Sequence, residues 1–192
     1  MENGLEKLKS IIRKSAFNQS PNYSVNVSFK DLFKRIGGLL SYNEKVELLV
    51  EKNHLSNDDI INYMTPAFQR NNTKWSRNMQ ICFVENLLCG LETKIQLYDV
   101  IDRGSELGEC FILDGLQRLT ALSAFHSGEF PVFDELYWSN MNSGGVFPRL
   151  RLTVNIFQFK SDREACEFYI QMNKGITHSE DDLKTAYDFL KT

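Results

Sequence analysis

Residues 110–120 read Cys-Phe-Ile-Leu-Asp-Gly-Leu-Gln-Arg-Leu-Thr, an apolar run that is interrupted at Asp114-Gly115 and then continues as a Leu-rich stretch. An apolar run that ends in Asp-Gly is typical of a buried strand followed by a sharp turn. A helix that begins near Gln117 presents its free backbone N–H groups beside Gln117 and Arg118, and such a helix start suits a phosphate. This corner between a strand and a helix is the first candidate for a binding site.

The segments around this corner alternate between strand and helix patterns. Residues 94–100 and 109–113 are expected to be paired strands joined by a turn at residues 102–104, and residues 150–159 have the period of two that indicates a strand. Helices are expected from Trp75 to Gly90, from about Gln117 to Gly128, from Ser161 toward Asn173, and from about Ser179 onward. This order predicts an α+β fold with a small mixed β-sheet flanked by helices.

The N-terminal region has a different pattern. Residues 1–55 are expected to be a helical N-terminal extension, ahead of a domain at residues 56–192. Residues 4–16 form an amphipathic helix pattern, residues 18–26 are polar enough for a loop, and Ser28 is in position to cap the next helix. The lysines of the first helix are explained more simply by a solvated helix face than by contacts with phosphate.

Composition excludes several classes of protein. The chain has 192 residues and a formal net charge of −3, which argues against nonspecific nucleic-acid binding by bulk charge, although a local basic stripe would still serve a duplex or a nucleotide. The four cysteines are expected to be reduced core residues, and neither they nor the three histidines have the spacing of zinc ligands. Because the sequence shows no secretion signal and no long apolar span, we expect a cytoplasmic protein without a membrane partner.

Two further polar segments accompany the corner. Residues 65–70 read Thr-Pro-Ala-Phe-Gln-Arg, and residues 172–175 read Met-Asn-Lys-Gly. Phosphate binding requires cations, backbone donors and usually a carboxylate that holds a divalent metal, and these segments supply the side chains. Arg118 and Arg70 are candidate phosphate clamps, Asp114 is a candidate metal ligand or general base, and Gln69, Gln117 and Asn173 are candidates for orienting water or for reading a base or ribose edge.

Each of these residues also has a plainer interpretation. Asp114-Gly115 alone is most simply a turn, Arg118 would equally serve as a structural partner of Asp114, and Gln69-Arg70 would serve as a loop tie. Taken separately, each plainer interpretation is favoured; a shared pocket is implied only by the order of these segments, which resembles that of the family described below.

The aromatic residues and histidines give weaker signals. Trp75 is expected to be a packing residue rather than a lid over a base, and Trp138 is a weak candidate for stacking on a base. His126 is expected to interact with the C-terminal dipole of its helix. Neither a nucleophile elbow nor a Walker-type loop occurs in the sequence.

Taken in order, these segments resemble the N-terminal domain family of GmrSD-type modification-dependent restriction enzymes, which has the ParB/sulfiredoxin-like fold. The resemblance covers about residues 58–185 and departs from the family at Leu116, where relatives carry a glutamine. The residues that match are Phe68-Gln69-Arg70, Trp75, Leu87-Leu88-Cys89-Gly90, Asp114-Gly115 with Gln117 to Leu122, and the segment from Phe168 to Gly175.

The resemblance implies a nucleoside-triphosphate-binding protein with Mg²⁺, which acts as an NTPase or phosphotransferase in DNA modification, restriction or counter-defence, in a bacterium or its phage. It implies that Asp114, Gln117 and Arg118 are catalytic, that Asp114 holds the metal, and that the nucleotide is bound by Gln69, Arg70, Gly115, Asn173 and Lys174. We expect no counterpart of the family's HNH-type nuclease domain in this sequence, which implies that the protein acts through a partner such as DNA or a restriction subunit, or performs a phosphoryl reaction itself. Two alternatives stay open: a non-catalytic module that binds DNA or a partner, and a kinase that acts on a hydroxyl of modified DNA or of a protein.

Overall fold

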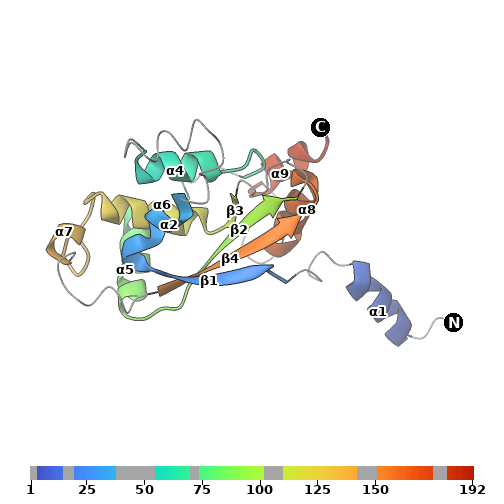
Figure 1. Ribbon diagram of the computed structural model, residues 1–192, viewed down its shortest axis with the longest axis horizontal. Coiled ribbons are helices and arrows are strands. Elements are labelled where there is room, and N and C mark those ends of the chain that lie inside the picture. The colour runs from blue at the N-terminus through green and yellow to red at the C-terminus, as the bar shows by residue number, and fades with distance from the viewer. Residues whose placement is uncertain are drawn as a thin grey trace.

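The computed structural model describes residues 4–14, 20–37, 55–69, 74–101, 110–141, 151–174 and 181–192. These residues form an α+β fold around a four-stranded mixed sheet with the strand order β1-β4-β2-β3 (Figure 1). The strands are β1 (Tyr23–Ser28), β2 (Lys94–Val100), β3 (Phe111–Asp114) and β4 (Arg151–Phe159). The helices are α1 (Gly4–Lys14), the 3-10 turn η2 (Phe29–Asp31), α2 (Leu32–Gly37), α4 (Asn57–Met64), α5 (Arg77–Leu88), α6 (Leu116–His126), α7 (Trp138–Met141), α8 (Asp162–Asn173) and α9 (Lys184–Phe189).

The sheet combines both kinds of strand pairing. β4 is antiparallel to β1 and parallel to β2, while β3 is antiparallel to β2, so β1 and β3 are the two edges. β4 follows the expected period of two at Leu152 and Val154, but from Asn155 to Phe157 every residue is buried. A strand that is covered on both faces loses the alternation of a half-exposed strand, which explains this difference.

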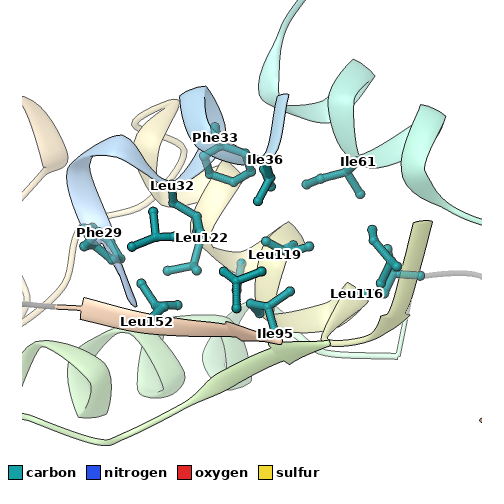
Figure 2. Packing of buried hydrophobic residues seen from close by; sticks show 14 of the residues in the cluster. Phe29, Leu32, Phe33, Ile36, Ile61, Ile95, Leu116, Leu119, Leu122 and Leu152 are labelled. Carbon is teal, nitrogen blue, oxygen red and sulfur yellow. The ribbon is translucent and has the colours of Figure 1, made fainter. Parts of the chain in front are cut away.

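Each face of the sheet carries its own hydrophobic core. One core contains side chains of α2, α4, α5 and α6 packed on alternate residues of the strands, such as Ile95 and Leu152. Figure 2 shows Leu119 and Leu122 of α6 and Leu32 of α2 above these two strand residues. The second core lies on the other face, where α8 and α9 cover residues such as Tyr98, whose ring lies 5.9 Å from that of Phe68.

The N-terminal region contributes directly to the first core, contrary to part of our expectation. Residues 18–26 were expected to be a polar loop, but Tyr23–Ser28 forms β1 and pairs with β4. The expected helical extension therefore contains a strand of the sheet, and Phe29 and Leu32 just after it are fully buried. Residues 23–27, Tyr-Ser-Val-Asn-Val, alternate between apolar and polar residues as a strand does. The polar composition of the whole segment led to the prediction of a loop instead.

The helices mostly end where their sequence signals lie. α5 stops at Gly90, where the Gly90 N–H donates to the carbonyl of Leu87 and the Leu91 N–H donates to that of Asn86, and α6 stops in the same way at Gly128. The Ser161 side chain accepts from the Glu164 N–H and caps α8 as expected. The last helix begins only at Lys184, while Ser179, its expected start, lies outside the described residues.

The turn between β3 and α6 depends on Gly115. Its φ of 108° lies in a region that L side chains rarely adopt, and a Cβ added there would lie 2.9 Å from Cδ1 of Ile95. Ile95 is fully buried in the first core, so its side chain has little room to withdraw. Glycine is therefore required by backbone conformation and by space together.

The cysteines only partly match their expected role. Cys110 and Cys166 are buried and free, and burial, more than any nearby charge, raises the pKa of each thiol to about 12. Cys82 and Cys89 are exposed on and after α5, so the expectation that all four are core residues is wrong for these two. Their places in apolar runs misled the prediction because α5 buries only one side.

His126 lies in an aromatic cluster rather than at an exposed helix end. Its ring stacks on Trp138 at a centroid distance of 4.0 Å and meets the rings of Phe29 and Phe33 edge-on. Burial lowers its pKa to about 4, and its Nε2 has no hydrogen-bond partner among the residues that the structure describes. His126 does lie in the last turn of α6, but burial disfavours the protonated imidazole that would interact most strongly with the helix dipole. Trp138 is likewise partly buried against the core, with its ring on His126 instead of open for a base.

Among the described residues, no helix has both the length and the apolar character that a membrane crossing requires.

Replacing Gly115 with alanine should lower the free energy of unfolding by roughly 1–3 kcal/mol more than Gly128→Ala does. Both positions have a positive φ, but of the two only Gly115 lacks space for a Cβ. Urea unfolding of both variants measures this difference. Ile95→Val removes Cδ1 and should recover part of the loss in the double variant. Equal losses at the two glycines would show that the contact with Ile95 does not matter.

His126 should make the fold less stable in acid. Its folded pKa of about 4 lies below the ordinary value of about 6.5, so the unfolded chain binds the proton more readily. The free energy of unfolding therefore has its full value above pH 6.5 and falls by about 2–3 kcal/mol as the pH decreases toward 4. Urea unfolding of the protein and of His126→Phe across this range should show a shallower pH dependence in the variant. Identical pH profiles would contradict burial of a neutral His126.

Candidate functional site

The corner between β3 and α6 is organised by an ion pair. Asp114 ends β3 and Arg118 lies in the first turn of α6, and Nη2 of Arg118 donates to Oδ2 of Asp114 in a short contact. Nη1 of Arg118 donates to the carbonyl of Lys94 at 2.5 Å and to Oγ1 of Thr93 at 3.4 Å. Arg118 therefore ties the start of α6 to the start of β2, which is the plainer structural role considered for it.

This tie still leaves part of both side chains available. Three of the five N–H donors of the Arg118 guanidinium are used, and the other two have no partner among the described residues. The second carboxylate oxygen of Asp114 is likewise unpartnered within the described part of the chain. The side chains of Arg118 and Asp114 are 23% and 32% exposed, so a ligand can reach both.

The small number of carboxylates at this corner limits the way in which it can bind a metal ion. Within the described residues, no group of three or more His, Cys, Asp or Glu side chains lies close enough to bind an ion. Mg²⁺ is commonly held by one or two carboxylates together with substrate phosphates and water. Asp114 fits that mode, in which the metal arrives with a phosphorylated ligand, and does not fit a site built from protein ligands alone.

Gln69 forms hydrogen bonds to the backbone of the edge strand β3. Its Nε2 donates to the carbonyls of Ile112 and Leu113, at 2.9 and 3.0 Å, beside a register irregularity in the β2–β3 pairing. Irregular pairing at an edge leaves backbone carbonyls without ladder partners, and the Gln69 amide satisfies them. Arg70, the other expected clamp of this segment, lies outside the described residues.

Gln117 links the start of α6 to the segment just before α5. Its Oε1 accepts a hydrogen bond from the Trp75 N–H at 3.2 Å, just ahead of α5. The Trp75 ring packs on Phe83 at a centroid distance of 5.3 Å, which matches its expected packing role. The amide nitrogen of Gln117 has no partner among the described residues and remains available to a ligand.

Asn173 and Lys174 lie at the end of α8. Asn173 is 4% exposed, and its Nδ2 donates to the carbonyl of Tyr169 at 2.9 Å within the helix. Lys174 is exposed just after α8. The Tyr169 ring lies 5.6 Å from that of Phe68, so this helix end is linked to the segment that carries Gln69. The structure thus gathers Gln69, Asp114, Gly115, Gln117 and Arg118 at one corner and connects Asn173 to it only indirectly.

Leu116, the position at which the sequence departs from the pattern that it resembles, is a core residue. It is 7% exposed and belongs to the first core, where Figure 2 shows it between the sheet and Ile61 of α4. A leucine at this inward-facing position contributes to packing instead of offering a polar group to a ligand.

The structure also reveals a polar row that sequence reasoning missed. The strand register aligns Ser24, Asn155, Gln96 and Asp114 across the whole sheet. Oγ of Ser24 donates to Oδ1 of Asn155 at 2.6 Å, whereas Oε1 of Gln96 is buried without a partner in the described part of the chain. A polar residue inside the apolar strand at 94–100 was the available signal, but only the register shows that Gln96 lies beside Asp114.

Comparison of the chain with models of known protein families, with curated proteins and with solved structures gave no match. The resemblance to the restriction-enzyme domain family therefore stays a prediction that rests on the quoted residues. The α+β fold itself is confirmed by the structure.

Replacing Gln69 with alanine should lower the free energy of unfolding by about 1–3 kcal/mol, because two backbone carbonyls lose their donor. Gln69→Glu should cost more, since a carboxylate would face the two carbonyl oxygens. Gln171→Ala on the exposed side of α8 is the matched control and should change stability by no more than about 0.5 kcal/mol. Urea unfolding of the three variants provides the comparison, and a Gln69→Ala protein as stable as the control would rule out the tie.

Proposed function

We propose that this protein binds a nucleoside triphosphate, together with Mg²⁺, at the corner formed by Asp114, Gly115, Gln117 and Arg118. In this proposal it is a cytoplasmic NTPase or phosphotransferase that acts in DNA modification, restriction or counter-defence, in a bacterium or its phage. The observation that carries the proposal is the Arg118 guanidinium, which is fixed beside the start of α6 while two of its donors remain unpartnered among the described residues.

The backbone at this corner favours an anion. The first helical bond of α6 runs from the Leu119 N–H to the carbonyl of Gly115, so the N–H groups of Leu116, Gln117 and Arg118 precede it. Such N–H groups carry the partial positive charge of the helix dipole and can donate to phosphate oxygens.

Arg118 and Gln117 would recognise the phosphates. The guanidinium matches phosphate oxygens in a bidentate way, and its bond to the Lys94 carbonyl fixes its orientation before a ligand binds. The free amide nitrogen of Gln117 adds a neutral donor on the next residue. Asp114 would hold the Mg²⁺, which supplies charge neutralisation at the phosphate oxygens when bound.

The remaining expected residues take supporting roles in this proposal. Gln69 holds the edge of β3 in place, so it positions Asp114 without contacting the nucleotide through its amide nitrogen. Lys174 adds an exposed cation at the end of α8, close to Asn173. The resemblance to the restriction-enzyme family supports the nucleotide as ligand, and DNA or a restriction subunit as partner.

A non-catalytic module is the second candidate, and the burial of Leu116 favours it. The family's glutamine would add a polar group at this point, but here the position is filled by an apolar side chain within the core. The corner therefore has fewer polar groups with which to orient water for hydrolysis than the family pattern implies. In this alternative the protein binds its ligand or partner without turnover.

Nucleotide binding should raise the melting temperature of the protein in the presence of Mg²⁺, because the ligand binds only the folded chain. Titration with ATP, GTP, CTP and UTP identifies the preferred base. Arg118→Ala should weaken binding about ten- to hundredfold, since a hydrogen bond to a charged group contributes roughly 1.5–3 kcal/mol. The control is Arg77→Ala, which removes a surface ion pair with Glu129 and should leave affinity unchanged.

The outcomes separate the two candidates. Release of phosphate from the bound nucleotide, lost in Asp114→Asn, would establish an enzyme, while binding without release would establish the module. If no nucleotide raises the melting temperature, or if folded Arg118→Ala binds as well as the control, the corner is not a nucleotide site.

A further inference from the structure

A second candidate surface lies at the edge of the sheet opposite the corner. A groove of about 1020 Å³ runs between β1 and α2, and the Asp114–Arg118 corner lies between β3 and α6. β1 and β3 form the two opposite edges of the sheet (Figure 1). Among the described residues, the lining of the groove contains one carboxylate, Asp31, and four cationic side chains, which are Lys30, Lys34, Arg35 and Arg151. In a chain of net charge −3 this is a local excess of positive charge.

The fold brings these cations together from distant parts of the chain. Phe29, Leu32 and Ile36 turn into the first core, and helical spacing then places Lys30, Lys34 and Arg35 on the outer side. The register of β1 with β4 pairs Ser28 with Arg151, which sets this fourth cation beside the start of η2.

The four cations are available for a ligand. All of them are exposed, and none makes an ion pair within the described part of the chain. Holding several unpaired cations around one concave surface is unfavourable because they repel each other, and a polyanion relieves that repulsion. The groove therefore complements repeated negative charge better than a single neutral ligand.

An aromatic side chain completes the groove. Tyr23, at the start of β1, is 53% exposed although it is a large aromatic residue, and it lines the groove together with Val25. Exposed aromatic rings beside a cationic groove are the means by which proteins bind single strands, because a base can stack on the ring while phosphates follow the cations. A paired duplex keeps its bases stacked on each other and gains nothing from such a ring.

We infer that the groove between β1 and α2 binds single-stranded nucleic acid, with its phosphates on Lys30, Lys34, Arg35 and Arg151 and a base on Tyr23. The inference does not depend on the nucleotide site, because the two lie at opposite edges of the sheet. If both hold, the protein binds a nucleotide at one edge and a strand at the other.

Fluorescence anisotropy with a labelled oligothymidine tests the charge contribution. Reversal of two cations in Lys34→Glu/Arg35→Glu should weaken binding at least tenfold and reduce the slope of log affinity against log salt by about 1. The control reverses two exposed cations at the far face, Arg163→Glu/Lys191→Glu, and keeps the same change in net charge. Equal losses of affinity in the two variants would show that only the net charge of the protein matters, and would overturn the inference.

Substitutions at Tyr23 test the stacking contribution. Tyr23→Ala should weaken binding roughly fivefold or more, and Tyr23→Phe should retain it, because the ring and not the hydroxyl contacts the base. Thermal unfolding confirms that each variant is folded. No binding of the oligothymidine, tighter binding of a duplex of the same length, or unchanged affinity in Tyr23→Ala would each overturn the inference. Nucleotide binding measured on the same variants should be unchanged, which separates this test from that of the corner.

Discussion

The close approach of Gly115 to Ile95 is the constraint on which the rest of the structure depends. Because the backbone passes so near the side chain of β2, the chain can turn directly from β3 into α6 and lay that helix on the sheet. The short turn also brings Arg118 within reach of the Lys94 carbonyl. A longer connection would separate the helix start from the strand, and the ion pair with Asp114 would no longer be tied to β2.

Several polar residues that were expected to bind a ligand form hydrogen bonds to the backbone instead. Gln69 satisfies two carbonyls of the β3 edge, Gln117 fixes the start of α5, and Asn173 bonds within its own helix. Polar side chains at a corner where strands and helices begin or end must first satisfy unpaired backbone groups. What remains for a ligand is a smaller set: the spare donors of Arg118, the amide nitrogen of Gln117 and one oxygen of Asp114.

Much of the fold could be predicted from the sequence because its signals are local. Glycines at positions 90, 115 and 128 mark helix boundaries, and apolar periodicity locates α5, α6, β2 and β3. β1 was missed because its alternation is short and polar, and its partner is far away along the chain. The polar row at Gln96 and the grouping of Lys34 with Arg151 depend on strand register and packing, which no local pattern specifies. His126 was misjudged because helix position suggests a charge, while the aromatic side chains that bury it come from other elements.

The pairing of β1 with β4 has a consequence for the order in which the chain can fold. Ser24 and Asn155 form a hydrogen bond across a separation of 131 residues, and β4 is the only strand beside β1 among the described residues. Contacts of such long range are slow to form because a large loop must close first. During synthesis the N-terminal strand and its adjoining apolar residues must wait until β4 has left the ribosome. Until then Val27 lacks its strand partner Leu152, and the nascent chain presents an unpaired strand that is open to wrong partners.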